Sequence, residues 1–463
     1  MDKKKITFSV YLGSCNDYNA ENVASIIEKA LTKMTLPKSI TGKVVIKPNL
    51  VMAHPKVATE SYTRKEVVEG ILRVIQKQGK DIEKIDIVEK SGLGITTATQ
   101  FRNAGYRKLK RKYPVQLRAM EERRRTTVVL EKGRIHSHIS IAREMAERDF
   151  LVFAPKFKTN VLADAYSGAL KLNIGTVDSK ERMFHHNHQL HVKIVDILEA
   201  ANPDLIVTDG IRLAFGGNQM TQHGTDMGMI VVSTNAVAHD IVCAKLLNLD
   251  PFKIEHIREA MERGYGPSSF EEIEILGDYP VENAQEIAKK LDFGFYRVEK
   301  FDCNFDIRSG VPYCTGGCQG IFLDWLHMIK DRKPKRLKKF PKLTALVGKV
   351  KGPVEAKKVL MVGDCAVASQ GVKSNKIIRI KGCPPTHKRI VWDMMVKYRL
   401  FAPLVRLDLI WDGFGLYPLK KLKGWLANIR YKPTIDNYEQ IPDSEIDIYP
   451  KNSTNNDQGL KIR

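Results

Sequence analysis

The chain has 463 residues, of which 43% are hydrophobic and 28% are charged, so the composition excludes a wholly disordered or fibrous protein. Lysine and arginine outnumber aspartate and glutamate by 75 to 53, and the resulting net charge of +22 favours anionic partners. No stretch reaches about 18 uninterrupted apolar residues, so the sequence predicts no membrane-spanning helix.

The N-terminal apolar run, residues 6–12, is interpreted as a first strand. It is followed by Gly13-Ser14-Cys15, which resembles a lipoprotein signal, but a run of about seven residues is at the lower limit for export. We therefore expect a cytoplasmic protein whose seven cysteines stay reduced and are free to bind metal.

Short β-branched runs alternate with amphipathic stretches as far as residue 278. The predicted strands are 43–46, 85–88, 150–153, 205–208 and 229–232. The predicted helices are 66–77, 190–201, 236–247 and 254–263. This alternation predicts an α/β fold with a mostly parallel sheet and helices on both faces.

Changes in composition divide the chain into four segments. We expect an α/β domain at 1–280, a smaller α/β cysteine module at 281–385, a basic aromatic tail at 386–448 and a disordered end at 449–463. Within the module, the pattern predicts a strand at 358–362, a helix at 366–371 and a strand at 377–380.

Cationic and amide side chains recur where predicted strands end, which is the edge at which parallel sheets bind ligands. The candidate binding residues for an anionic small molecule are Lys47, Asn49, Lys156, Lys158, Thr159, Lys171, Asn173, Arg182 and Asp209. A glycine-rich stretch containing Gly216, Gly217, Gly224 and Gly228 is predicted to form a loop that wraps a ligand. The cluster His185, His186, His188 and His191 could ligate a metal, although no carboxylate pattern accompanies it.

Four of the seven cysteines form a candidate metal centre. Cys314 and Cys318 flank a glycine-rich turn, whereas Cys365 and Cys383 each follow a predicted strand and adjoin glycine. Four thiolates can hold a [4Fe–4S] cluster or a zinc ion. The Gly-x-Cys … Gly-Cys-Pro-Pro pair resembles the cluster-binding pattern in the small iron–sulfur subunit of complex I-type and hydrogenase enzymes. We therefore favour the cluster, with zinc and packed thiols as alternatives.

Several motifs resemble the domain of unknown function 362 family. The similarity extends over about residues 6–278 and includes the segments 45–51, 156–159, 168–175, 207–210 and 233–240, in the order typical of the family. The resemblance implies association with iron–sulfur modules. Asn160 and Gly216-Gly217-Asn218 depart from the family pattern, which puts any role of these positions in doubt.

Three functional hypotheses follow. The first is an iron–sulfur redox protein or redox enzyme that acts on an anionic small molecule and exchanges electrons with a partner protein. The second is a non-catalytic electron carrier or metallocentre-assembly protein. The third is a redox-silent transferase or ligase with zinc or no metal. No nucleic-acid-binding motif was found, so nucleic acid is not an expected partner.

The tail alternates aromatic and basic residues. This pattern suits a peripheral membrane contact or a protein partner, or the aromatic residues could cap the core of the cysteine module with the cations solvated outside. The aromatic and neighbouring residues are Trp392, Met395, Tyr398, Phe401, Trp411, Phe414, Tyr417 and Trp425; the basic ones are Lys388, Arg389, Lys397, Arg399, Lys420, Lys421 and Lys423.

Overall fold

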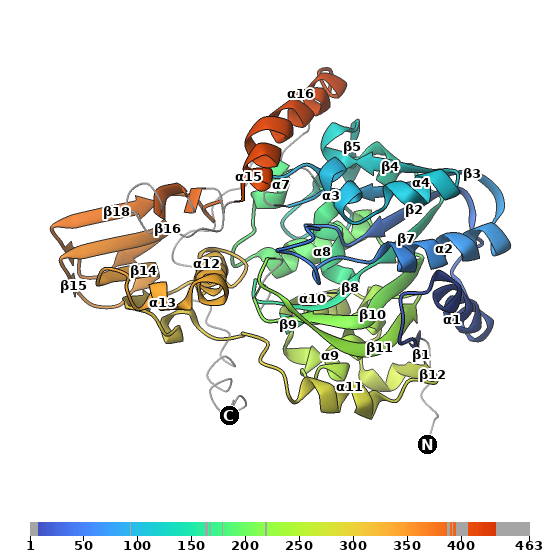
Figure 1. The fold of residues 1–463 in the computed structure, drawn as a ribbon, viewed down its shortest axis with the longest axis horizontal. Coiled ribbons are helices and arrows are strands. Elements are labelled where there is room, and N and C mark those ends of the chain that lie inside the picture. Colours follow the sequence, from blue (N-terminus) through green and yellow to red (C-terminus); the bar gives the residue numbers. More distant parts are fainter. Residues whose placement is uncertain are drawn as a thin grey trace.

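The structure is a computed structural model that describes residues 8–92, 94–162, 165–166, 168–177, 179–217, 220–386, 389–390, 392–394 and 406–431. A large α/β unit and a smaller sheet lie side by side, and a C-terminal helix projects from the large unit (Figure 1). No helix within these residues is long and apolar enough to cross a membrane.

The large sheet is mostly parallel, as predicted. Strands run in the order β12 (Ile273–Gly277), β1 (Phe8–Ser14), β11 (His223–Ser233), β10 (Leu205–Phe215), β7 (Phe150–Ala154), β2 (Thr41–Pro48), β3 (Lys80–Glu89) and β4 (Val115–Ala119). Strands β10, β7, β2, β3 and β4 pair in parallel, and β1 pairs in parallel with β12. The two antiparallel pairings on this path are those of β11 with β1 and with β10.

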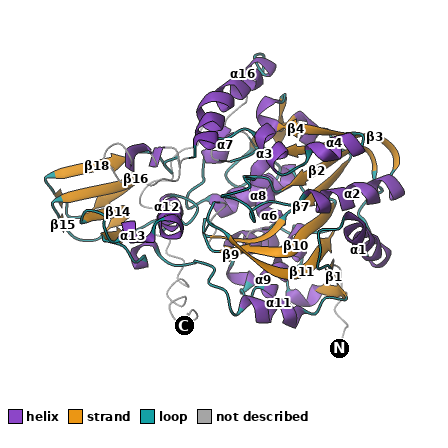
Figure 2. Cartoon of the chain, viewed as in Figure 1, coloured by secondary structure: helices purple, strands orange, loops and turns teal. Residues whose placement is uncertain are grey.

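Helices cover both faces of this sheet (Figure 2). Alternate residues of a strand point to opposite faces, so Val44 and Ile46 pack with α1 (Ala20–Lys33) and α2 (Lys65–Gln78). Val45 packs on the other face, in the core formed with α8 (Leu190–Ala200), α9 (Ala236–Leu246) and α10 (Glu255–Glu262). The helix α11 (Val281–Ala288) contributes Ala284 and Ala288 to this second core.

Lys156 and Lys158 follow β7, as predicted, and lie in another strand, β8 (Lys156–Asn160), which pairs with β10. One local prediction for the large unit was wrong. Gly224 and Gly228 lie inside the long strand β11 and therefore do not form a ligand-wrapping loop. Only Gly216 and Gly217, with φ of 69° and 81°, occupy the turn after β10, and Asn218 is outside the described residues.

The smaller sheet has four parallel strands, in the order β13 (Phe305–Ser309), β14 (Leu343–Val350), β16 (Lys358–Ala368) and β18 (Lys376–Ile380). The helix α12 (Cys318–Arg332) packs on it through Phe322 and Leu326. The predicted helix at 366–371 is wrong: β16 continues to Ala368 because Val367 pairs with Lys349 of β14.

Residues 406–431 of the tail pack on the large unit, whereas Ile390 and Met394 belong to the core of the smaller sheet. A continuous helical segment comprises α15 (Leu407–Ile410), a wider turn at Trp411–Leu416 and α16 (Tyr417–Ala427). It contacts the short helix at Met120–Glu122 of the large unit. The expectation that the aromatic residues cap the cysteine module is wrong for Trp392, Trp411, Phe414 and Trp425, which are 54–65% exposed. Outside the described residues lie Lys388, Met395, Lys397, Tyr398, Arg399, Phe401 and the end predicted to be disordered.

Candidate functional site

Lys47 lies at the carboxyl end of β2, where its ammonium is 2.9 Å from Glu89 at the end of β3. Both side chains are buried, and the parallel pairing of β2 with β3 brings them together. Burial lowers the pKa of Lys47, and Glu89 opposes this effect. Glu89 also accepts hydrogen bonds from the backbone N–H groups of Leu50 and Lys90. This carboxylate was not identified from the sequence, although it directly follows the predicted strand at 85–88.

Lys156 forms a second buried ion pair, with Asp209. Their atoms are 2.9 Å apart because the register of β8 and β10 places the two residues opposite each other. Asp209 also accepts hydrogen bonds from the Tyr18 hydroxyl and from the Arg64 backbone N–H. Burial lowers the pKa of Lys156, and Asp209 opposes this effect. Two of the four predicted lysines are thus neutralised by carboxylates.

Lys158 and Lys171 have no carboxylate partner within the described residues. Burial, together with the charges of Lys47 and Lys156, lowers the pKa of Lys158 to about 8, although Glu89 opposes this shift. Burial and the charge of Lys158 lower the pKa of Lys171 to about 7. The Lys171 ammonium is buried and has no hydrogen-bond partner within the described part of the chain. Lys158 therefore lies within electrostatic range of each of the other three lysines, and neither Lys158 nor Lys171 forms an ion pair with a carboxylate within the described residues.

Polar atoms without partners accompany these cations. The side-chain oxygens of Asn49, Thr159 and Asn173 are buried and accept or donate no hydrogen bond within the described residues. Buried polar atoms are normally paired. These three unpaired oxygens belong to candidate binding residues and are therefore available to a polar ligand. Arg182 has a different position: it donates to the carbonyls of Ile174, Ser91 and Lys90 and thereby holds two loops together.

The four candidate cysteines lie within electrostatic range of one another. Cys318 is the first residue of α12 and Cys314 lies in the turn before it; Cys365 lies in β16, and Cys383 follows β18, the parallel neighbour of β16. Burial, together with the thiols of Cys365 and Cys383, raises the pKa of Cys314 to about 12. The pKa of Cys318 is raised by burial and by the other three thiols.

Glycine shapes the backbone around these thiols. A Cβ added at Gly363, which has a φ of +97°, would lie 2.4 Å from the Cys318 sulfur. This position therefore requires glycine both for its conformation and for the approach of the thiol. Within the described residues, no group of three or more His, Cys, Asp or Glu side chains is arranged to hold a metal ion. This holds for the histidine cluster and also for the four cysteines in the conformation described here.

The segment from His185 to Leu190 joins the lysines to the cysteines. The imidazole Nδ1 of His186 is 2.6 Å from the Gly316 carbonyl oxygen of the cysteine loop. Burial, together with the charge of Lys171, lowers the pKa of His186 to about 3. The Asn187 amide is 3.6 Å from the Cys383 sulfur. His191 is turned elsewhere, with its ring stacked on that of His256. The two candidate sites are thus neighbours, which could not be derived from the sequence.

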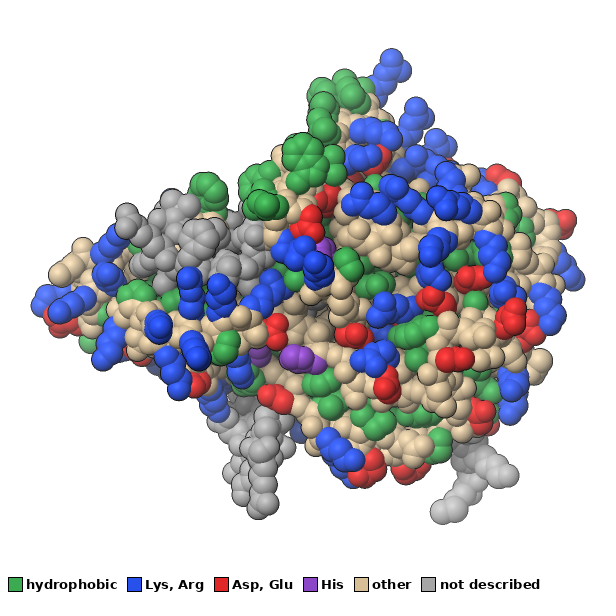
Figure 3. Space-filling view, in the orientation of Figure 1, with side chains coloured by type: hydrophobic (Ala, Val, Ile, Leu, Met, Phe, Trp, Pro, Cys, Tyr) green, Lys and Arg blue, Asp and Glu red, His purple; other side chains and the backbone are tan. Residues whose placement is uncertain are grey.

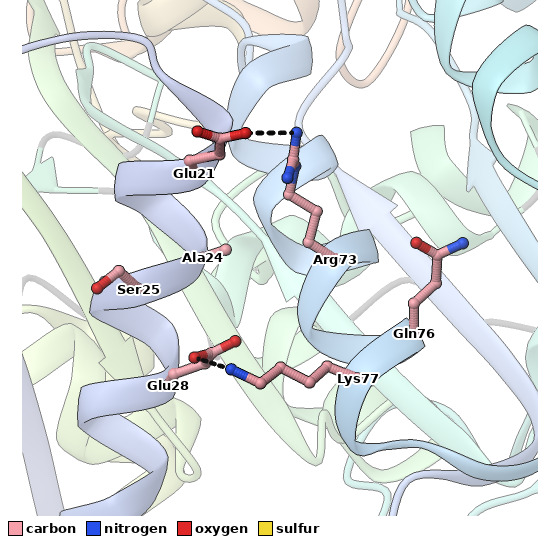
Figure 4. A pocket seen from close by; sticks show the side chains of 7 residues that line it. All are labelled: Glu21, Ala24, Ser25, Glu28, Arg73, Gln76 and Lys77. Atoms are coloured by element: carbon pink, nitrogen blue, oxygen red, sulfur yellow. Dashed lines mark hydrogen bonds and ion pairs between the residues drawn. The ribbon is translucent and has the colours of Figure 1, made fainter.

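A groove of about 450 Å³ between α1 and α2 is a separate feature. Figure 4 shows it spanned by the ion pairs Glu21–Arg73, at 3.2 Å, and Glu28–Lys77, at 2.7 Å. Both cations of the groove pair with its carboxylates, so the groove is a weaker candidate for an anion site than the lysine site.

Residues 44–245, which include all nine candidate binding residues, match the family model described as domain of unknown function (DUF362). This match agrees with the resemblance that the motifs of this segment indicated. The thylakoid-associated protein sll1697 of Synechocystis sp. is 25% identical over 268 residues, which are 55% of this chain and 80% of that protein. The cysteine loop lies outside the matched DUF362 segment.

Among solved structures, the lactate racemase apoprotein of Thermoanaerobacterium thermosaccharolyticum is similar with a TM-score of 0.33 and 10% sequence identity. The similarity covers 75% of this chain and 71% of that protein. A score this low supports no conclusion about activity.

Proposed function

We propose that this protein is an iron–sulfur redox protein that acts on an anionic small molecule. A [4Fe–4S] cluster would be held by Cys314, Cys318, Cys365 and Cys383, and the anion would bind at Lys158 and Lys171. The observation that carries the proposal is the contact between His186 and Gly316, which makes the two sites neighbours. The proposal includes a cytoplasmic location, where thiols stay reduced.

The chemistry of the four cysteines supports the cluster proposal. Four thiolates form the usual ligand set of a [4Fe–4S] cluster. Burial and the neighbouring thiols raise the pKa values of Cys314, Cys318 and Cys365, so a bound group that carries positive iron ions would stabilise their thiolates. Gly363 leaves room beside Cys318 where a side chain would collide with its sulfur. A bound cluster would supply one-electron transfer.

The lysine residues would bind and orient the anion. Two buried ammonium groups without carboxylate partners attract a negative group more strongly than solvated lysines do, because water screens less in the interior. With a pKa of about 7, the Lys171 ammonium can hold or release a proton near neutral pH. Asn49, Thr159 and Asn173 supply hydrogen-bonding atoms that have no other partner within the described residues.

The decisive experiment counts iron and sulfide in protein purified and reconstituted without oxygen, and records its electron paramagnetic resonance spectrum after reduction. We expect about four iron and four sulfide per chain. Cys383→Ser should lose the cluster, whereas the matched variant Cys303→Ser should keep it. Zinc at one per chain, or metal content unchanged by Cys383→Ser, would contradict the proposal.

Anion binding is tested separately by thermal shift. Phosphate, sulfate and citrate are suitable probes because the substrate is not identified. We expect at least one of them to raise the melting temperature of the wild type and to leave Lys171→Met unaffected. A redox protein with a cluster but no response to any anion would instead support a non-catalytic electron carrier.

A further inference from the structure

The C-terminal helical segment exposes an apolar face to solvent. Most of its exposed apolar residues recur at intervals of three or four, which places them along one broad side of a helix. They are Leu407 (84%), Ile410 (37%), Trp411 (65%), Phe414 (54%), Leu419 (63%), Leu422 (51%), Trp425 (60%), Leu426 (56%) and Ile429 (60%). In Figure 3 this face forms an apolar ridge at the top of the molecule. Soluble helices normally turn such a face towards a core.

The opposite, polar face attaches the segment to the large unit. Asp412 accepts hydrogen bonds from the Thr96 backbone N–H and hydroxyl and from the Thr99 hydroxyl. Gly424 is buried against the Glu121 carbonyl, where an added Cβ would lie 1.9 Å from the oxygen. Asn428 donates to the Arg123 carbonyl and accepts from the Arg125 N–H. Because its polar face is used internally, the helix is held with its apolar face outward.

Cations surround the apolar face. Lys421 and Arg430 are exposed beside it and have no ion pair within the described residues. The helix α4 (Arg107–Lys112) carries five more basic residues, and all five are exposed. Figure 3 shows Lys and Arg side chains gathered beside the ridge along the same upper edge of the molecule.

We propose that this face docks the protein onto a membrane surface that carries anionic headgroups. Two tryptophans, Trp411 and Trp425, lie along the ridge, and tryptophan favours the level of the headgroups. Aliphatic residues such as Leu422 and Ile429 would enter the boundary of the acyl chains, as in interfacial amphipathic helices. The flanking cations complement the anionic headgroups, and the net charge of +22 adds long-range attraction. The proposal does not depend on the redox function.

The test is flotation of the full-length protein with vesicles of phosphatidylcholine alone or mixed with phosphatidylglycerol. We expect binding to the mixed vesicles that weakens with salt. Trp411→Glu combined with Trp425→Glu should lower the partition coefficient by about tenfold or more, because charged side chains replace the apolar anchors. Phe252→Glu, an exposed apolar residue far from the ridge, is the matched control and should bind like the wild type.

Charge variants provide a second test. Lys421→Glu and Arg430→Glu should each lower binding to the mixed vesicles by at least about fivefold, because a cation near an anionic surface contributes about 1 kcal/mol. Lys290→Glu, in an exposed position elsewhere, is the control.

Wild-type protein that ignores both kinds of vesicle, or a tryptophan variant that binds as well as the wild type, overturns the proposal. Light scattering adds a third result: a wild-type dimer that the tryptophan variant converts to monomer, without vesicle binding, would mean that a second copy of the chain covers the face.

Discussion

Replacing Lys171 by Met should stabilise the anion-free protein. The Lys171 ammonium is buried without a partner in the described part of the chain, and its pKa falls from the ordinary 10.5 to about 7. At 1.36 kcal/mol per pH unit, this difference corresponds to on the order of 5 kcal/mol against the charged form. Methionine fills a similar volume without a charge, so below pH 7 we expect a gain of roughly 2–5 kcal/mol in the free energy of unfolding.

This gain should shrink as the pH rises. The unfolded chain keeps the Lys171 proton up to about pH 10.5, whereas the folded protein keeps it only to about pH 7. Between these values unfolding takes up a proton, so the stability of the wild type rises with pH and the penalty of the buried charge is lost. The advantage of Lys171→Met should therefore be full below pH 7 and fall by up to about 1.4 kcal/mol per pH unit above it.

Urea denaturation across about pH 6 to pH 10 measures this dependence. The matched control is Lys290→Met, since Lys290 is exposed, and it should change stability by no more than about 0.5 kcal/mol. If Lys171→Met is less stable than the wild type, or if its advantage does not vary with pH, Lys171 has a compensating partner and the lysine cluster is not an anion site.

Three other predictions concern single positions. Glu89→Gln leaves Lys47 without its ion-pair partner and should lower the free energy of unfolding, measured with urea, by about 3–5 kcal/mol. Glu28→Gln breaks the more exposed pair with Lys77 and should lower it by less than about 1 kcal/mol; equal losses would contradict the buried pairing. Gly363→Ala should reduce the iron content of reconstituted protein, whereas Gly352→Ala, with a similar φ of +83° but open space around it, should only lose about 1–2 kcal/mol of stability. Equal iron content in the two variants would mean that Gly363 does not shape the cysteine site. Gly424→Ala should detach α16 from the large unit and speed proteolysis of the tail, while Gly413→Ala, whose added Cβ would meet nothing closer than 3.4 Å, should not. An unchanged rate of digestion in Gly424→Ala would refute the tight docking of this helix.

The sequence predicted features that depend on local pattern and on parallel pairing. Buried runs such as 43–46 and 150–153 correctly located β2 and β7, because a strand buried on both faces is a continuous apolar run. Lys47 and Lys171 could be selected because they follow or lie near such runs. The sequence could not show that Glu89 and Asp209 neutralise two of the lysines, since this depends on the register between strands far apart in the chain.

Other features depend on tertiary contacts. The stretch 366–371 resembles a helix locally, but pairing with β14 makes its first part a strand, so tertiary structure overrides propensity. The sequence also showed that the tail is amphipathic without showing which face is covered. Only the contacts of Asp412 and Gly424 with the large unit show that the polar face is docked and the apolar face is outward.

The central claim is that four cysteines hold a cluster next to the lysine site. Iron and sulfide counts on anaerobically reconstituted wild type, Cys383→Ser and Cys303→Ser test it most directly. The account predicts about four iron and four sulfide per chain in the wild type and in Cys303→Ser, and a loss of both in Cys383→Ser. Wild-type protein without iron, or Cys383→Ser with the same iron content as Cys303→Ser, would contradict it.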